Sequence, residues 1–245
     1  VAIGQVADKL AEQLRLEAVG APVLKPRVIS APNGGPFTLD GTRTYLVGRE
    51  RVAVIDPGPD VTSHIRALRV ALDSATDVKV LLTHAHGDHA GGAVALARLC
   101  NASLLATESF RAPASGPPDL RFLQVGDRIG TDQGSLVTVG IPGHTRDHVA
   151  FHWEETDALF VGDLLLGRGS TTWIGEYLGC VEDYLRSLDR VTRLNPSILY
   201  PGHGPPITDT EATLDRFRRH RLERLKEVAE ARRRSPEATP EALAT

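Results

Sequence analysis

The feature that most constrains this chain is a dense group of metal-binding side chains at the end of a predicted buried strand. The apolar run 78–82 is typical of a strand, and directly after it comes Thr83-His84-Ala85-His86-Gly87-Asp88-His89. An apolar, helix-like segment, residues 90–100, follows. Active sites of α/β proteins tend to lie at such a strand-to-helix edge. Four ligand-type side chains at this density favour a divalent cation, which accepts lone pairs from all of them; a solvated polar loop is the alternative.

Four other places share one layout, in which an apolar strand and a tight glycine turn accompany a polar residue. Three of them end at His144, Asp163 and His203, and the fourth is the corner that begins with Asp56. Glycine lets the backbone turn sharply and approach an ion closely. Because strand ends on one side of a sheet converge, these side chains can meet although they are distant in sequence. With the central cluster they supply five histidines and two aspartates, which suits two divalent ions.

The rest of the chain alternates predicted strands and helices. Strands are expected at residues 28–30, 44–47, 52–55, 78–82, 103–106, 120–125, 135–141, 149–153, 158–161 and 197–200. Helices are expected at residues 6–16, 61–72, 90–100, 181–194 and 210–234. The strands between 120 and 161 have the spacing of an antiparallel meander. The Pro/Gly-rich segment 112–118 is expected to be a loop at the rim of the site.

Composition sets outer limits on the function. A chain of 245 residues is long enough for one large α/β domain. Its net charge of −3 gives no global electrostatic argument for binding nucleic acid or a membrane. No apolar run approaches the roughly 20 residues of a membrane span. The two cysteines, Cys100 and Cys180, are expected to be free thiols, which fits a reducing compartment.

The ligand pattern resembles that of the metallo-β-lactamase superfamily: His84-x-His86-x-Asp88-His89 with His144, Asp163 and His203. The resemblance implies an α/β fold, the four-layered αβ/βα sandwich of two mixed sheets flanked by helices, with two metal ions at one edge between the sheets. It also implies the ligand sets. His84, His86 and His144 hold one ion; Asp88, His89 and His203 hold the other; Asp163 bridges them. Zn²⁺ is the first expectation for both ions, with Mn²⁺ or Fe²⁺ as alternatives.

Further stretches resemble one group within this superfamily, the β-lactamase-like-protein-2 group, whose animal member is a single-strand-selective endoribonuclease of mitochondria. They are residues 33–47, 142–148, 162–172, 200–206 and 219–224. The chain departs from the group's pattern at Gly34 and at Arg43, where a cation replaces a neutral residue near the expected substrate pocket. The group's small C-terminal winged-helix-like domain would begin about where this chain ends.

Three functions follow as hypotheses. The first, by resemblance, is an endoribonuclease that cleaves single-stranded RNA phosphodiesters through a metal-bridging hydroxide. The second is a hydrolase of the same fold that acts on small thioesters, lactones or β-lactams. The third is a non-catalytic metal-binding scaffold, against which the complete set of ligand positions argues. The carboxylate of Asp163 matters because true β-lactamases of the superfamily lack it, whereas phosphodiesterases and thioesterases have it.

Individual residues receive expected roles. Asp88, Asp163 and His148 are expected to be catalytic, with His148 as a proton donor or phosphate contact; a merely buried, hydrogen-bonded histidine is the alternative. Asp56 and Thr145 are expected to orient ligands from behind, although Asp56 could simply form a turn. The candidates for substrate binding are Arg43, Ser170, Thr171, Trp173 and Tyr177.

The expected domain organisation has four parts. Residues 1–27 form an N-terminal helix and linker, 28–208 the catalytic domain, 209–234 a basic helix, and 235–245 a frayed tail. The basic helix is either a solvated surface or a contact for an RNA backbone. The expected partner is single-stranded RNA or a small ester-type substrate. No membrane is expected as a partner, and the protein is expected to be a monomer or a homodimer. The expected compartment is the cytoplasm, or the mitochondrion in a eukaryote.

Overall fold

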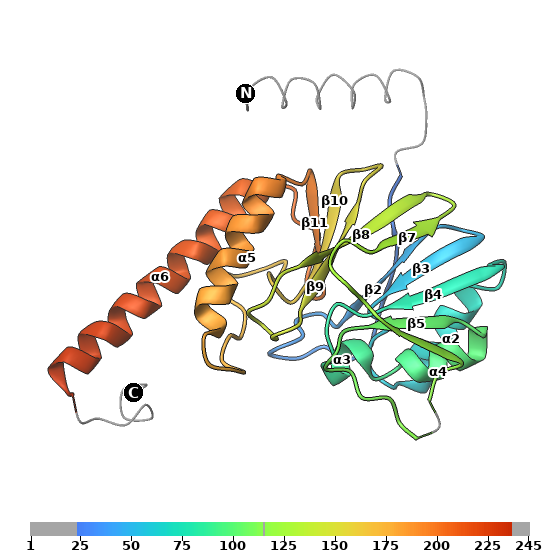
Figure 1. Ribbon diagram of the computed structural model, residues 1–245, viewed down its shortest axis with the longest axis horizontal. Helices are drawn as coiled ribbons and strands as arrows, with labels where there is room; N and C mark the ends of the chain where they lie inside the picture. The colour runs from blue at the N-terminus through green and yellow to red at the C-terminus, as the bar shows by residue number, and fades with distance from the viewer. Residues whose placement is uncertain (1–23, 115, 237–245) are drawn as a thin grey trace, which may run out of the picture.

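Two β-sheets lie face to face in the computed structural model, which describes residues 24–114 and 116–236 (Figure 1). The first sheet contains, in spatial order, β1 (Arg27–Ser30), β2 (Arg43–Val47), β3 (Arg51–Ile55), β4 (Asp77–Leu81), β5 (Ser103–Ala106) and β6 (Asp119–Phe122). The second contains β11 (Ile198–Pro201), β10 (Ala158–Gly162), β9 (Val149–Trp153), β8 (Gly134–Gly140) and β7 (Arg128–Thr131). The helix predicted over 6–16 lies outside the described residues.

Helices cover the outer face of each sheet. They are α2 (Thr62–Ala71), α3 (Gly87–Ala90), α4 (Ala93–Cys100), α5 (Cys180–Leu194) and α6 (Thr210–Arg234). Figure 1 places α2 and α4 beside the first sheet and α5 and α6 beside the second. The order of layers is therefore helix, sheet, sheet, helix. The predicted four-layered sandwich of two mixed sheets is confirmed.

Side-chain alternation along β3 explains why both faces of the first sheet are covered. Val52 and Val54 belong to an apolar cluster shared with α2 and α4, whereas Ala53 and Ile55 belong to the cluster between the two sheets. Successive side chains of a strand point to opposite faces, so a strand that is apolar at every position needs a layer on each side. A third cluster packs the second sheet against α5 and α6.

The strand pairings correct the predicted meander. Strands β8 to β10 are joined antiparallel as expected, and β7 pairs antiparallel with β8, but β6 pairs parallel with β5 in the first sheet. Residues 123–127 carry the chain from one sheet to the other, and Gly126 adopts φ +94° in this crossing. The meander begins instead at β7. That strand was not predicted because its short sequence, Arg-Ile-Gly-Thr, has a single apolar side chain at its centre.

The helix predicted over 90–100 is divided in two. Asp88 and His89 lie on the short helix α3, and α4 begins only after Gly91 and Gly92. Both glycines sit against backbone atoms, since a Cβ on Gly91 would lie 2.5 Å from the Gly87 carbonyl oxygen. Two side-chain-free residues allow the chain to turn tightly between the metal-binding segment and α4.

Two expectations of composition can be compared with the structure. Cys100 and Cys180 are both free thiols, as predicted. Within the described residues, no helix combines the length and the apolar character that crossing a bilayer requires.

Candidate metal centre

Seven predicted ligands meet at one edge of the sandwich because each follows the end of a strand. His84 and His86 follow β4, and α3 then supplies Asp88 and His89. From the second sheet, His144 follows β8, Asp163 follows β10 and His203 follows β11. Both sheets thus contribute ligands to the groups that could each hold an ion.

The first group consists of three imidazole nitrogens. Nδ1 of His86 lies 3.1 Å from Nε2 of His84 and 3.0 Å from Nε2 of His144. His84 and His144 are buried, and His86 is half-buried. Three histidine nitrogens at this separation match the donor set of a tetrahedral zinc-type site with one position open.

The second group mixes nitrogen and oxygen. Nε2 of His89 lies 3.2 Å from Nε2 of His203, and that nitrogen of His203 lies 3.2 Å from Oδ2 of Asp88. Both histidines are buried, and Asp88 is half-buried. The carboxylate makes this group more anionic than the first.

Asp163 stands between the two groups. Its Oδ2 lies 3.7 Å from Nε2 of His144, and its Oδ1 lies 3.3 Å from Nε2 of His89 and 3.5 Å from Nε2 of His203. The Oδ1 atom is buried and has no hydrogen bond with acceptable geometry among the described residues. One oxygen therefore faces each group, which is the disposition of a carboxylate able to bridge two cations.

Hydrogen bonds behind the first group fix where its ring protons lie. His144 Nδ1 is 2.8 Å from the carbonyl oxygen of Trp173, and His86 Nε2 is 3.3 Å from a carboxylate oxygen of Glu176. His84 Nδ1 is 3.0 Å from Thr83 Oγ1, whose own proton goes to Asp56. Each of these outer nitrogens faces an acceptor and must carry the proton. The three inner nitrogens consequently present lone pairs to one another.

The second group follows the same rule. His89 Nδ1 is 2.9 Å from Oδ2 of Asp56, and His203 Nδ1 is 3.3 Å from the carbonyl oxygen of Gly41. Asp56 is fully engaged, since it also accepts from the backbone N–H of Thr83 at 2.8 Å. The inner Nε2 atoms of both histidines therefore face each other and the carboxylates of Asp88 and Asp163.

This arrangement fits divalent cations. In the first group, burial lowers the pKa of His84 and of His144, so neither ring gains a second proton that would relieve the repulsion between lone pairs. In the second group, burial opposes protonation of His203, but its bonds to Asp163 and Asp88 outweigh this and raise its pKa to about 9. Positive charge is thus favoured at the second group even without a metal ion. A cation at each group satisfies all the inner donors.

Two glycines make room for the ligands. A Cβ on Gly202 would lie 2.5 Å from the ring of His89 and 2.8 Å from Oδ1 of Asp163. Gly162 adopts φ +48°, and a Cβ there would lie 2.6 Å from Thr83 Oγ1 and 2.8 Å from His148 Nε2. Both glycines are needed for close approach, as expected for turns that carry a ligand directly afterwards.

His148 is buried beside the first group. Its ring stacks on His84 with 4.8 Å between centroids, and its Nε2 accepts the backbone N–H of Asp163 at 3.2 Å. Its Nδ1 has no hydrogen-bond partner among the described residues, and the side chain also lines a cavity of about 290 Å³ that lies over β8. Nε2 is thus occupied by a backbone contact, and in the neutral ring the proton lies on Nδ1.

Two other predicted residues contact neighbours outside the ligand set. Arg43 pairs with Asp40 at 2.7 Å, and its side chain is 18% exposed. Thr145 donates to Asp147 at 3.3 Å. The Arg43 charge is therefore partly neutralised by a neighbouring carboxylate.

The loop between β10 and α5 contains the remaining predicted substrate contacts. Trp173 is 54% exposed and its ring stands edge-on to His144, with 6.1 Å between centroids. Tyr177 donates to Asp183 at 2.9 Å and lies under the guanidinium of Arg146. Thr171 is exposed and Ser170 is half-buried. Of these predicted substrate contacts, Trp173 is the one that contacts a predicted metal ligand, His144.

Sequence reasoning missed three groups that contact ligands: the Glu176 carboxylate, the Thr83 hydroxyl and the Gly41 carbonyl. Thr83 could have been found, because it directly precedes the cluster. Glu176 lies in a loop without periodicity, and a backbone carbonyl leaves no mark in a sequence.

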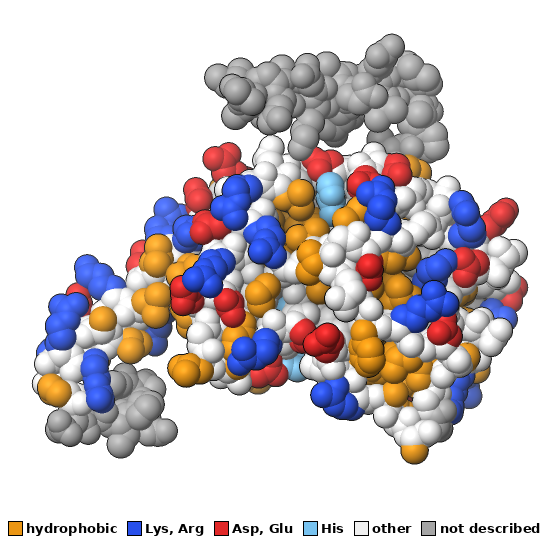
Figure 2. Space-filling view, in the orientation of Figure 1, with side chains coloured by type: hydrophobic (Ala, Val, Ile, Leu, Met, Phe, Trp, Pro, Cys, Tyr) orange, Lys and Arg blue, Asp and Glu red, His pale blue; other side chains and the backbone are white. Residues whose placement is uncertain are grey.

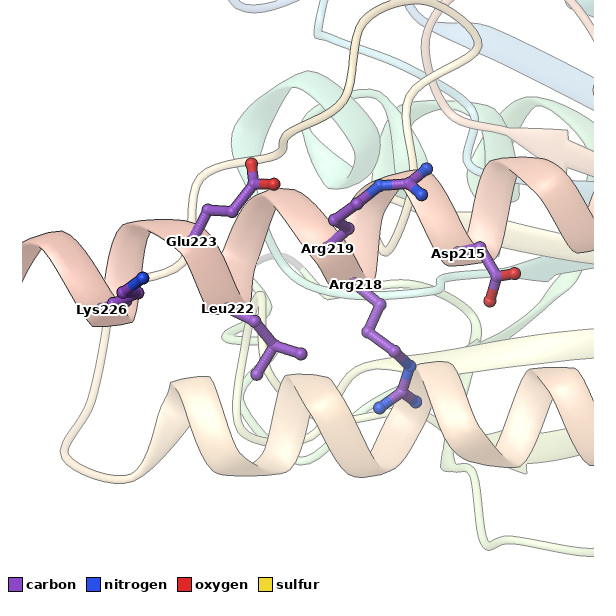
Figure 3. Close-up of a pocket in the computed structure, with 6 residues that line it drawn as sticks. All are labelled: Asp215, Arg218, Arg219, Leu222, Glu223 and Lys226. Atoms are coloured by element: carbon purple, nitrogen blue, oxygen red, sulfur yellow. The ribbon is translucent and has the colours of Figure 1, made fainter.

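The basic helix α6 uses several of its cations internally. Arg216 donates to the carbonyl of Gly169 and Arg221 to that of Thr172, while Arg218 bonds to Asp189 of α5. A groove of about 340 Å³ along this helix is lined by Asp215, Arg218, Arg219, Leu222, Glu223 and Lys226. Figure 3 shows both acidic and basic side chains around it. The helix therefore does not offer a purely cationic surface to a phosphate backbone.

Comparison with known proteins gives consistent results. The profile of the family described as "Metallo-beta-lactamase superfamily" matches residues 37–203. "Beta-lactamase-like protein 2 homolog" of Caenorhabditis elegans is 34% identical over 213 residues, which cover 84% of this chain and 70% of that protein. "Atrochrysone carboxyl ACP thioesterase" of Aspergillus chevalieri is 39% identical over 220 residues, covering 86% and 68%.

A solved structure also matches. A beta-lactamase domain protein from Burkholderia ambifaria superimposes with a TM-score of 0.72 at 25% identity, over 86% of this chain and 76% of that one. The chain spans between 57% and 70% of the length of the curated relatives that it matches.

Proposed function

Because this chain belongs to the metallo-β-lactamase superfamily, we propose that it is a hydrolase that holds two divalent ions and cleaves acyl thioesters. The observation that carries the proposal is the position of Asp163, which presents one carboxylate oxygen to each of two groups of inward-facing lone pairs. His84, His86 and His144 would hold one ion, and Asp88, His89 and His203 the other. Zn²⁺ is the first candidate, and Mn²⁺ or Fe²⁺ would suit the same donors.

The side chains around the ions have defined tasks. When bound, two divalent ions lower the pKa of a water molecule toward neutrality and polarise a carbonyl oxygen. Asp163 remains a carboxylate: burial would raise its pKa, but the neighbouring His89 and His203 hold that pKa well below its usual range. The outer acceptors Asp56 and Glu176 keep the imidazoles oriented. In hydrolysis, the oxygen of water bonds to the acyl carbon, the carbon–sulfur bond breaks, and a thiol and a carboxylic acid leave.

The site's proton donors favour a thioester over a phosphodiester. Cleaving a phosphodiester expels an alkoxide, which needs a proton or a strong cation nearby. A thiol has a pKa of about 8.5, so a thiolate leaves without such help. Nε2 of His148, the expected proton donor, already accepts the backbone N–H of Asp163. Bound ions would stabilise an alkoxide, but a thioester makes the smaller demand on the side-chain proton donors of the site.

The rim of the site favours an apolar acyl group. Trp173 is half-exposed beside the first group. Phe37 is 82% exposed, in the loop that ends at Gly41, whose carbonyl contacts His203 of the second group. Exposed aromatic rings in the two loops that contact the ligands would contact an apolar chain or ring. On the face that Figure 2 presents, cations and anions are intermixed rather than gathered into one basic field.

A second candidate substrate is single-stranded RNA. Similarity to the C. elegans Beta-lactamase-like protein 2 homolog, together with the resemblance to the endoribonuclease group, supports it. The stacking of Arg146 on Tyr177 could support a nucleobase in the same way that it supports the phenol ring. The Arg43–Asp40 pair counts against it, since that pair reduces the net positive charge beside the site.

The test is to assay the metal-loaded protein with three substrates: aromatic and long-chain acyl thioesters with a thiol-reactive dye, a labelled single-stranded RNA, and a chromogenic β-lactam. We expect thiol release by the wild type and a loss of at least about 10³-fold in Asp163→Asn. Glu227→Gln is the matched control, because within the described part of the chain Glu227 forms an ion pair with the exposed Arg224 alone. Cleavage of RNA without thiol release would overturn the thioester proposal in favour of the second candidate. Inactivity on all three with both ions bound would refute both.

A further inference from the structure

We propose that the loop of residues 169–176 positions the ligands of one metal ion and not those of the other, with Glu176 and Arg221 as its positioning residues. The inference rests on the proposed two-ion site and assigns to the basic helix α6 a function inside the molecule. It concerns the two histidines of the first group whose outer nitrogens contact this loop.

Two contacts join the loop to the first group. The carbonyl of Trp173 accepts from Nδ1 of His144 at 2.8 Å, and a carboxylate oxygen of Glu176 lies 3.3 Å from Nε2 of His86. Acceptors at the outer nitrogen of a metal-binding histidine select its tautomer, orient its ring and make the inner nitrogen more basic. A loop that shifted would therefore disturb two of the three donors of the first ion at once.

The loop is held in place by α6. Arg216 Nε donates to the carbonyl of Gly169 at 3.1 Å, and Arg221 Nη2 donates to the carbonyl of Thr172 at 2.9 Å. Arg221 also lies over the ring of the buried Tyr184 in α5, 5.6 Å from its centroid. Thr172 directly precedes Trp173, so the Arg221 bond fixes the peptide next to the one that contacts His144. Arg221 thus acts through Trp173, without contacting a ligand itself.

The second group is oriented by different parts of the chain. Asp56, after β3, contacts His89, and the carbonyl of Gly41, before β2, contacts His203. Just before the loop, the Gly167 N–H donates to the backbone carbonyl of His203. Substitutions of side chains at 176 or 221 leave that bond in place. The contacts of Glu176 and Arg221 can therefore be removed by mutation without changing the side-chain contacts behind His89 and His203.

The test measures metal binding rather than turnover. Zn²⁺ or Co²⁺ is titrated into chelator-treated protein against a competing chromophoric chelator, for the wild type, Glu176→Gln and Arg221→Ala. We expect two ions in the wild type, and in Glu176→Gln one ion retained with its affinity unchanged and one weakened by about 10–100-fold. Arg221→Ala weakens the same ion, and Arg221→Lys recovers part of the loss, because an ammonium can donate to the same carbonyl.

Two further variants decide which ion is affected. Asp88→Asn removes a carboxylate of the second group and is expected to weaken the other ion, so Glu176→Gln with Asp88→Asn should weaken both. Arg218→Ala is the matched control from the same helix, because Arg218 bonds to Asp189 and Leu185 of α5 and Figure 3 shows it directed at that helix rather than at the loop. Circular dichroism melts confirm that each variant is folded.

The possible outcomes separate this inference from the proposed function. Two ions bound by the wild type, with equal affinities in Glu176→Gln and in the wild type, would overturn the positioning role and leave the two-ion site intact. A double variant that weakens a single ion would also overturn it, since both side chains would then act on the same group. A wild type that binds fewer than two ions would refute the proposed site itself.

Discussion

At the residue scale, the five imidazoles of the site share one hydrogen-bonding rule. Each outer nitrogen faces an acceptor, and each inner nitrogen faces the other donors. The rule leaves the inner nitrogens only two states in which their repulsion is relieved: an added proton or a bound cation. The two groups differ in which state they adopt in the absence of metal, because carboxylates lie nearer to the inner nitrogens of the second group, which has Asp88 besides Asp163.

This difference predicts proton release at the second group. The pKa of His203 is about 9, so at pH 7 the metal-free protein holds a proton on this ring that a cation must displace. Apparent affinity should therefore rise with pH up to about 9 and fall by roughly tenfold per unit below it. Calorimetric titration of the metal in two buffers of different ionisation enthalpy measures the protons released. No proton release at pH 7 would contradict the assignment.

Gly202 provides a second prediction at this scale. In Gly202→Ala the new methyl group would lie 2.5 Å from the ring of His89 and 2.8 Å from Oδ1 of Asp163, so these two ligands must shift. We expect the variant to lose at least one ion, measured as metal content after gel filtration. We also expect it to lose hydrolytic activity. Gly130→Ala is the control, since a Cβ on that strand glycine meets nothing within 4 Å. Full metal content in Gly202→Ala would show that the ring has room to shift.

The sequence anticipated which side chains meet but only part of what lies behind them. Strand ends of one sheet converge, which accounts for the meeting of His144, Asp163 and His203 on the second sheet; their place opposite the 84–89 cluster of the first sheet followed from the resemblance of the ligand pattern. Glu176 could not be placed in this way, because its contact depends on the path of an irregular loop. Gly41 could not either, because its contribution is a carbonyl that every residue possesses.

At the element scale, α6 divides into an anchored half and an exposed half. Leu214 and Phe217 are buried in the cluster outside the second sheet, whereas Leu225 and Val228 are exposed. Phe217→Ala should lower the free energy of unfolding by about 3–5 kcal/mol, while Leu225→Ala should change it by less than about 0.5 kcal/mol. Urea denaturation measures both. A large effect of Leu225→Ala would reveal packing on the outer half of the helix.

Periodicity predicted most elements and failed at the crossing between the sheets. β8, β9 and β10 alternate or are apolar throughout, so their pairing followed from spacing. β6 ends in two exposed residues, and β7 has one apolar side chain among four residues. The sequence of neither strand therefore indicates which sheet it joins. Pairing with β5 and with β8 determines which sheet each strand joins, and local strand propensity does not predict this pairing.

At the scale of the whole molecule, bound ions should raise stability. Ligands that bind only the folded protein stabilise it by about 2.7 kcal/mol at a hundredfold excess over Kd. For a chain of this size that corresponds to a rise in Tm of roughly 5–11 °C per ion. Melting scans with and without a chelator test this. The fall in Tm on adding a chelator should be smaller for Glu176→Gln than for the wild type. If the chelator leaves the Tm of the wild type unchanged, a metal centre between the sheets is contradicted.

The crossing at residues 123–127 divides the chain into two consecutive halves, one for each sheet. Each proposed ion takes two ligands from the earlier half and one from the later: His84 and His86 with His144, and Asp88 and His89 with His203. Neither half alone assembles a site. A protein cleaved at this crossing would thus form two fragments whose reassociation is governed by metal concentration, which makes the fold a natural starting point for a metal-dependent split reporter.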